Sequence, residues 1–235
     1  MALPRLNESP KYEIIIPSTQ KSIRYRPFLV KEQKVLLMAL ESEDQRQILN
    51  SIVNTIEACV IDPVKTQELT TFDVEYMFTQ IRAKSVGETS DIQIKCKSCE
   101  HMNPIKIKLD DIKVDMPKID NTIKLDDKYA ITMRFPKYAS SIETAVNGKT
   151  STEQMYSMIA NCLDTLNTDD EIINFADEAK EDILKFVESL TSAQFEKIVS
   201  FVQQMPQLKH DVQYDCEACG EKNEAVLQGM QDFFS

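Results

Sequence analysis

Two pairs of cysteines are the residues of this sequence best suited to do chemistry. Cys96 and Cys99 lie in QIKCKSCEHMN, and Cys216 and Cys219 lie at the same spacing in VQYDCEACGEKNEA. Four thiolates in two such turns suit a tetrahedral zinc ion, with Zn–S bonds of about 2.3 Å. We therefore predict one structural zinc site with these four cysteines as ligands. Four thiolates can also hold iron, so the metal itself stays open.

The alternatives are two unrelated cysteine pairs or a redox dithiol. A redox pair would normally open a helix after a strand. Here the flanking segments DIQIKC, NPIKIKL, DVQYDC and NEAVLQG alternate apolar and polar residues, which is typical of strands. Each pair is therefore predicted at the tip of a β-hairpin, and the two hairpins together would form a zinc ribbon. His101 and His210 lie near the two pairs and could replace a cysteine, but we expect them to be exposed.

About half of the chain separates the two pairs, and an internal duplication would explain this distance. When the sequence around the first pair is aligned to that around the second, several residues match without a gap. The same alignment places Asn103 opposite Asn223. Upstream, LTTFDVEYMFTQI resembles LTSAQFEKIVSFV, and TIEACVID resembles MIANCLD. SIRYRPF resembles TMRFPKY, with Arg24 aligned to Arg134. We interpret this order of matches as a tandem duplication with halves at 1–120 and 121–235. A chance match is the alternative.

The elements that would position the cysteines are predicted from periodicity and capping residues. The fold class is α+β and helix-dominated, with two similar halves that each end in a CxxC hairpin and share one zinc-ribbon-like site. Asp44 or Ser42 is the expected cap of the second helix, and Cys59 and Cys162 are expected in the core. We expect a hairpin at 12–27, helices at 30–42, 43–60 and 70–86, a strand at 126–136, and helices at 141–146, 151–166, 179–190 and 192–205.

The composition excludes several classes of function. The chain has 235 residues and a net charge of −11, without a stripe dense in lysine and arginine, so nucleic-acid binding is not expected. No apolar run is long enough to span a membrane, and no secretory signal begins the sequence, which favours a reducing compartment and free thiols. No nucleophile elbow, phosphate loop or HExxH motif is present, so we expect no catalytic residues and no enzyme activity.

Charged residues near the two cysteine pairs differ in sign. The first pair is flanked by lysines and the second by Asp215, Glu217, Glu221 and Glu224. The acidic residues would offset the positive charge that a nucleic-acid-binding groove needs. Opposite charges also suit two hairpins that face each other. Arg24 and Arg26 are expected on one face of their strand, where acidic groups of a partner or of the same chain could bind them. At the C-terminus, Phe233 and Phe234 would pack on the second half or insert into a neighbouring subunit.

The segment PKYEIIIPSTQKSIRYRPFLVKEQKVLLMALES, residues 10–42, resembles the T4-type bacteriophage baseplate hub protein family. IPST and the longer YRPFLVKEQKVLLMALES carry the resemblance, which covers about the first fifth of the chain. It implies a structural or assembly protein of a contractile phage tail, made in the host cytoplasm and located in the virion baseplate. The implied partners are other hub and tail proteins, with copies of itself a further possibility.

Two other functions stay open beside a hub subunit. A transient tail-assembly chaperone, not retained in the virion, would share every feature described above. A zinc-ribbon nucleic-acid-binding protein would use the hairpins, although the acidic second pair opposes it. A hydrolase built from dispersed carboxylates has no support in the sequence.

Overall fold

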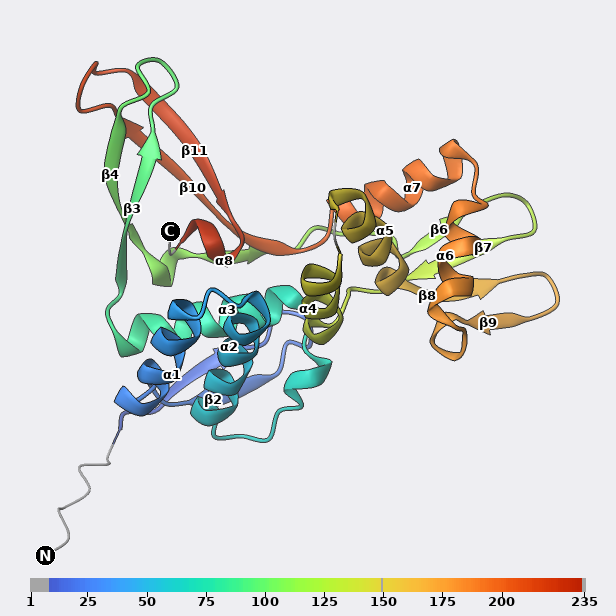
Figure 1. Ribbon diagram of the computed structural model, residues 1–235, viewed down its shortest axis with the longest axis horizontal. Coiled ribbons are helices and arrows are strands. Elements are labelled where there is room, and N and C mark those ends of the chain that lie inside the picture. Colours follow the sequence, from blue (N-terminus) through green and yellow to red (C-terminus); the bar gives the residue numbers. More distant parts are fainter. Residues whose placement is uncertain (1–8, 149, 234–235) are drawn as a thin grey trace, which may run out of the picture. The chain divides into compact units, whose positions relative to one another are not determined.

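A computed structural model describes residues 9–148 and 150–233, and it contains both helices and antiparallel strands (Figure 1). The mixed helix and sheet class is therefore confirmed. The helices are α1 (Val30–Glu41), α2 (Gln45–Cys59), α3 (Thr71–Ser85), α4 (Tyr138–Asn147), α5 (Ser151–Cys162), α6 (Lys180–Glu188), α7 (Ser192–Gln203) and α8 (Gly229–Asp232). The strands are β1 (Tyr12–Ile15), β2 (Ser22–Tyr25), β3 (Thr89–Lys95), β4 (Met102–Lys108), β5 (Lys113–Asp115), β6 (Thr122–Lys124), β7 (Ala130–Met133), β8 (Leu163–Asn167), β9 (Ile172–Asn174), β10 (Gln207–Asp215) and β11 (Lys222–Gln228).

The chain forms two compact units. Unit 1 comprises Met1–Thr66, Phe72–Asp115 and Gln207–Ser235, and unit 2 comprises Gln67–Thr71 and Met116–Pro206. This division differs from the predicted halves 1–120 and 121–235, because the C-terminal segment belongs to unit 1. The reason is strand pairing: β10 pairs with both β11 and β5, which ties the end of the chain to the middle.

The N-terminal part of unit 1 agrees with the expected elements. β1 and β2 form an antiparallel hairpin, and α1, α2 and α3 follow within the predicted ranges. Asp44 is the cap of α2, since its side chain accepts hydrogen bonds from the backbone N–H groups of Arg46 and Gln47. Such a cap satisfies donors that the first helical turn leaves without a partner.

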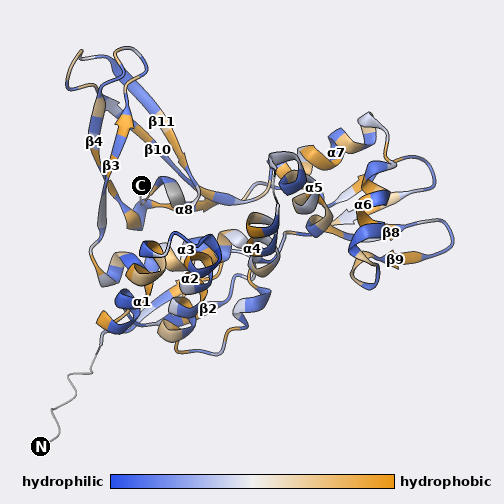
Figure 2. Cartoon of the chain, viewed as in Figure 1, coloured by the Kyte–Doolittle hydropathy of each residue, from blue (hydrophilic) through white to orange (hydrophobic). Residues whose placement is uncertain are grey.

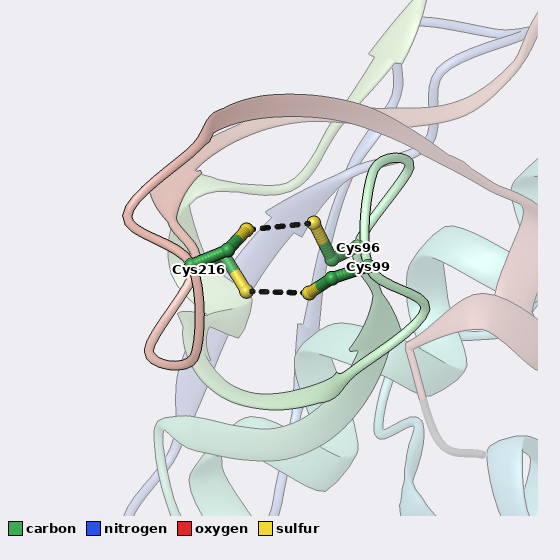
Figure 3. Close-up of side chains that lie close together, drawn as sticks. Cys96, Cys99 and Cys216 are labelled. Atoms are coloured by element: carbon green, nitrogen blue, oxygen red, sulfur yellow. Dashed lines mark hydrogen bonds between the residues drawn. The ribbon is translucent and has the colours of Figure 1, made fainter.

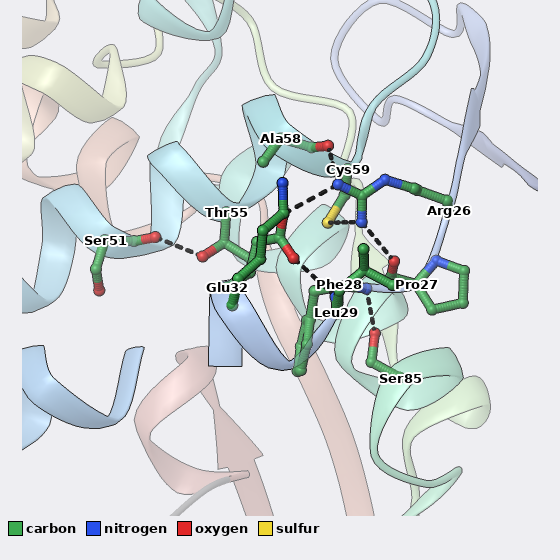
Figure 4. A network of polar contacts seen from close by, with 11 residues as sticks. Arg26, Pro27, Phe28, Leu29, Glu32, Ser51, Thr55, Ala58, Cys59 and Ser85 are labelled. Carbon is green, nitrogen blue, oxygen red and sulfur yellow. Dashed lines mark hydrogen bonds and ion pairs between the residues drawn. The ribbon is translucent and has the colours of Figure 1, made fainter. Parts of the chain in front are cut away.

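Arg26, directly after β2, joins the chain at this point to α1 and α2 (Figure 4). Its guanidinium donates to the carbonyl oxygen of Ala58 at 2.7 Å and pairs with the carboxylate of Glu32 at 3.0 Å. Glu32 is 7% exposed, and it also accepts the N–H of Leu29 at the start of α1. Two residues earlier, on β2, Arg24 pairs with Asp62 at 2.7 Å in a more exposed position. Both arginines therefore bind acidic groups of the same chain.

Replacement of Arg26 by alanine is expected to lower the free energy of unfolding by about 2–3 kcal/mol, because it removes the less exposed of the two cations that pair with the buried Glu32 carboxylate; the other cation, Lys31, is largely exposed. Arg24→Ala is the matched control. Its ion pair with Asp62 is more exposed, so we expect a clearly smaller loss. Urea unfolding of the two variants beside the unmodified chain measures both values. Equal losses would contradict the assigned role of the Arg26–Glu32 pair.

The rest of unit 1 is built from β-hairpins over a common apolar core. β3 pairs with β4, and β5, β10 and β11 form a three-stranded sheet. Apolar and polar residues alternate along these strands (Figure 2), so that one face of each is buried. The fully buried residues Leu109, Leu208 and Phe233 belong to this core. Phe233 thus packs within unit 1, while Phe234 lies outside the described residues.

Glu75 is a half-buried acidic residue beneath this C-terminal segment. It lies on α3 and accepts a hydrogen bond from the backbone N–H of Met230 on α8. Burial raises the pKa of its carboxyl from 4.5 to about 7. Because the folded pKa is the higher one, the stability that the protonated carboxyl contributes is complete below about pH 4.5. It is lost as the pH rises through about 7.

A Glu75→Gln variant is therefore expected to be more stable than the unmodified chain at pH 8, by about 2 kcal/mol after allowance for partial exposure. At pH 4.5 the two chains should be similar. Urea unfolding across this pH range measures the difference. Glu41→Gln, at the exposed end of α1, is the control for replacing a glutamate by glutamine. A constant difference at all pH values would contradict the pKa assigned to Glu75.

Unit 2 contains an antiparallel sheet in the order β6-β7-β8-β9. Its core joins the buried strand residues Ile131 and Leu163 to Ile159, Val187 and Phe201 from the helices. Two expectations need correction here. The helix predicted at 151–166 ends at Cys162, and the strand predicted at 126–136 is confined to Ala130–Met133. In the first case Leu163 turns to extended backbone and pairs with Met133, so tertiary strand pairing outweighs the local helical pattern.

Within the described parts of the chain, none of the helices has the length and apolarity needed to cross a bilayer.

Candidate metal centre

Each cysteine pair lies in the turn of a hairpin in unit 1. Cys96 and Cys99 follow β3, and the Cys96 N–H donates to the carbonyl of His101 at 2.8 Å. The second hairpin has the same bond, from the Cys216 N–H to the carbonyl of Glu221 at 2.9 Å. In both turns the residue after the second cysteine has a positive φ, 62° at Glu100 and 71° at Gly220. The two turns therefore share one backbone shape.

The four sulfur atoms lie close together. All of them fall within 4.8 Å of one another, with 3.8 Å between Cys96 and Cys219 and 3.6 Å between Cys99 and Cys216 (Figure 3). A tetrahedron with bonds of about 2.3 Å has edges of about 3.8 Å, so these spacings suit a four-coordinate ion bound by thiolates. Cys96 and Cys216 are buried and the other two are exposed, and all four are free of disulfides.

The pKa values of the thiols differ widely within the cluster. Backbone N–H groups of Cys99 and Ser98 lower the pKa of the Cys96 thiol to about 6. At Cys219 a backbone bond from Glu221 lowers the pKa, but the neighbouring thiols and burial together raise it to about 12. Four negative charges at this spacing repel one another, and a bound divalent ion would hold every thiol deprotonated.

The other candidate ligands lie elsewhere. His101 is exposed and His210 is half-buried on β10, and the metal-ligating group found among the described residues consists of the four cysteines alone. Cys59 and Cys162 are fully buried, and burial raises the pKa of their thiols to about 11 and about 12. These two cysteines pack as small apolar residues of the core, as predicted.

The two hairpins pack apolar side chains into one core, and the polar contacts described between them are hydrogen bonds, not ion pairs of the flanking charges. Lys95 and Lys106 form ion pairs within their own hairpin, with Glu100 and Asp91. Across the hairpins, the Tyr214 hydroxyl donates to the carbonyl of Lys95 at 3.1 Å.

Two buried asparagines, Asn103 and Asn223, make further contacts between the hairpins. The alignment of the two cysteine pairs already placed these asparagines opposite each other. Nothing in their type or spacing indicated what they bind.

Comparison with known protein families gives one match over most of the chain. A family model described as T4 bacteriophage base plate protein matches residues 9–235. No curated protein and no solved structure matches the chain significantly.

Proposed function

Because the chain belongs to the T4 bacteriophage base plate protein family, we propose that it is a subunit of the baseplate hub that acts by binding other baseplate proteins. The family itself supports a structural role in the baseplate and a place in the virion tail. The hub position is our proposal, and it is supported by the resemblance of residues 10–42 to hub proteins. The match over residues 9–235 is the observation that carries the structural role.

Exposed apolar side chains along α1 support a role in protein binding. Val30 is 80% exposed, and Val35, Leu37, Met38 and Leu40 are each at least half-exposed. Apolar side chains gathered on one short helix commonly mark a surface that another protein covers. These side chains lie inside the segment that resembles hub proteins, so the resemblance and the exposed apolar surface concern the same residues.

The experiment that tests this function is mass spectrometry of tails purified from the phage that encodes the chain. A hub subunit is expected in completed tails at a constant ratio to other baseplate proteins. A chain that is present in infected cells but missing from completed tails would favour the transient tail-assembly chaperone instead. A shift of DNA in a binding assay, weakened by added salt, would favour the nucleic-acid-binding alternative.

We also propose that the four cysteines hold one structural zinc ion, which clasps the two hairpins together. The sulfur spacing of 3.6–3.8 Å and the closed set of four ligands support this proposal. Elemental analysis of the purified chain is expected to give one zinc ion per chain. A closed site offers no position for a substrate, which fits a protein without enzyme activity.

The proposed duplication has support in matching backbone contacts. The N–H of Arg26 donates to the carbonyl of Cys59 at 3.0 Å, and the N–H of Arg134 donates to that of Cys162 at 2.7 Å. These two equivalent hydrogen bonds align Arg134 with Arg26. The sequence comparison had instead aligned Arg134 with Arg24, two residues earlier. An experimental structure in which the two halves superpose with this alignment would test the duplication.

A further inference from the structure

Asn103 and Asn223 are buried side chains beside the cysteine cluster. They are 1% and 3% exposed, and each is the second residue of the strand that follows its CxxC turn, in β4 and β11. A buried amide costs free energy unless its donors and acceptor are bonded. Both amides are bonded, and the partners of each come from both hairpins.

The acceptor oxygens cross from one hairpin to the other. Asn103 Oδ1 accepts the N–H of Glu217 at 2.9 Å, and Asn223 Oδ1 accepts the N–H of Lys97 at 3.0 Å. Lys97 follows Cys96 directly, and Glu217 follows Cys216 directly. Each asparagine therefore holds the backbone next to the first cysteine of the opposite hairpin, and the two contacts are reciprocal.

The amide NH2 groups bind nearer the turns. Asn103 Nδ2 donates to the carbonyl of His101 and Asn223 Nδ2 to that of Glu221, both at 2.9 Å. Asn223 Nδ2 also lies 3.4 Å from Cys96 Sγ, as a donor to that sulfur across the hairpins. Each asparagine side chain thus bonds both its own turn and the opposite turn. Asn223 also bonds a thiol of the cluster.

We propose that Asn103 and Asn223 are positioning residues that align the two turns so that the four thiols converge on one ion. This role rests on the proposed zinc clasp and adds residues outside the ligand set. Groups that orient metal ligands by hydrogen bonding typically change metal affinity by about 10–100-fold when they are removed. The hydrogen bonds themselves involve no metal, so they hold the turns in register before an ion binds.

Zinc affinity of the full-length chain, measured by competition with a chromogenic chelator, tests the proposal. Asn103→Ala and Asn223→Ala are each expected to bind zinc about 10–100-fold more weakly. Their Co2+ forms should show a weakened or shifted thiolate-to-metal charge-transfer band. Asn54→Ala, at an exposed position on α2, is the matched control and should leave the affinity and the spectrum unchanged.

A proline at position 97 removes the same hydrogen bond from its donor side, because proline has no N–H. Lys97 follows the first residue of the turn, a position that accepts proline readily. Lys97→Pro and Asn223→Ala both remove the bond from the Lys97 N–H to Asn223 Oδ1, so the double variant should bind zinc no more weakly than the more weakly binding single variant. Lys97→Pro and Asn103→Ala remove different bonds, so their double variant should bind zinc more weakly than either single variant. A general loss of stability would not produce this contrast.

These measurements distinguish a failure of the positioning role from a failure of the zinc clasp. If the unmodified chain binds no zinc, the clasp fails and the positioning role fails with it. If the unmodified chain binds one ion and the alanine variants bind it equally well with unchanged Co2+ spectra, the clasp stands and the positioning role is overturned. Should an alanine variant not fold, Lys97→Pro decides, since it keeps both asparagines in place.

Discussion

Replacement of Cys99 by serine is expected to remove most of the bound zinc and to destabilise unit 1. The hydroxyl of serine is a poor ligand beside three thiolates, so a closed four-thiolate site becomes incomplete. Structural zinc contributes up to about 10–16 kcal/mol in zinc-finger peptides, so the loss of even a quarter of that value lowers the free energy of unfolding by about 3 kcal/mol. Cys219→Ser should have the same effect, because its sulfur lies 3.8 Å from that of Cys96 in the same cluster.

Elemental analysis and thermal unfolding with and without a chelator measure this result. The unmodified chain should lose stability when the chelator is added, whereas Cys99→Ser should respond little because its site is already impaired. Ser98→Ala is the control, since it changes the same turn and keeps all four thiols. If Cys99→Ser and Cys219→Ser each keep the full metal content, the two hairpins do not share one site.

Replacement of Phe233 by alanine is expected to lower the free energy of unfolding by about 3–5 kcal/mol, as for other large core aromatics. The side chain is fully buried and belongs to a core that includes Ile92 on β3, Ile107 on β4 and Leu208 on β10. The carbonyl of Phe233 also accepts a hydrogen bond from the hydroxyl of Ser90 at 2.8 Å. The C-terminal segment thus completes the core below the cysteine-bearing turns.

Urea unfolding of Phe233→Ala measures this loss, with Val226→Ala as the control. Val226 lies on β11 and is half-exposed, so its truncation should cost less than about 1 kcal/mol. A loss of similar size in both variants would mean that Phe233 does not fill the core in solution. Insertion into a neighbouring subunit, the alternative considered from the sequence, would then regain support.

Local chemistry made several elements predictable from the sequence alone. The cap formed by Asp44 and the helical apolar spacing after it define α2 without tertiary information. The alternating residues around each CxxC pair likewise indicated strands on both sides of the cysteines. The convergence of Cys96, Cys99, Cys216 and Cys219 was predicted because tetrahedral thiolate chemistry requires four ligands and the chain supplies two equivalent pairs.

Burial and strand pairing could not be predicted in the same way, because they depend on neighbours distant in the sequence. Met38 has an apolar side chain suited to a core but is 58% exposed on α1. Leu163 continues a helical pattern, yet pairing with Met133 on β7 makes it the start of β8.

The sequence by itself determined which side chains could bind a metal, since the type of each ligand and the spacing within each cysteine pair depend on the sequence alone. Only the tertiary structure decided that Asn103 and Asn223 bond across the hairpins. Their bonds exist only once two turns from distant parts of the chain lie within hydrogen-bond distance of each other.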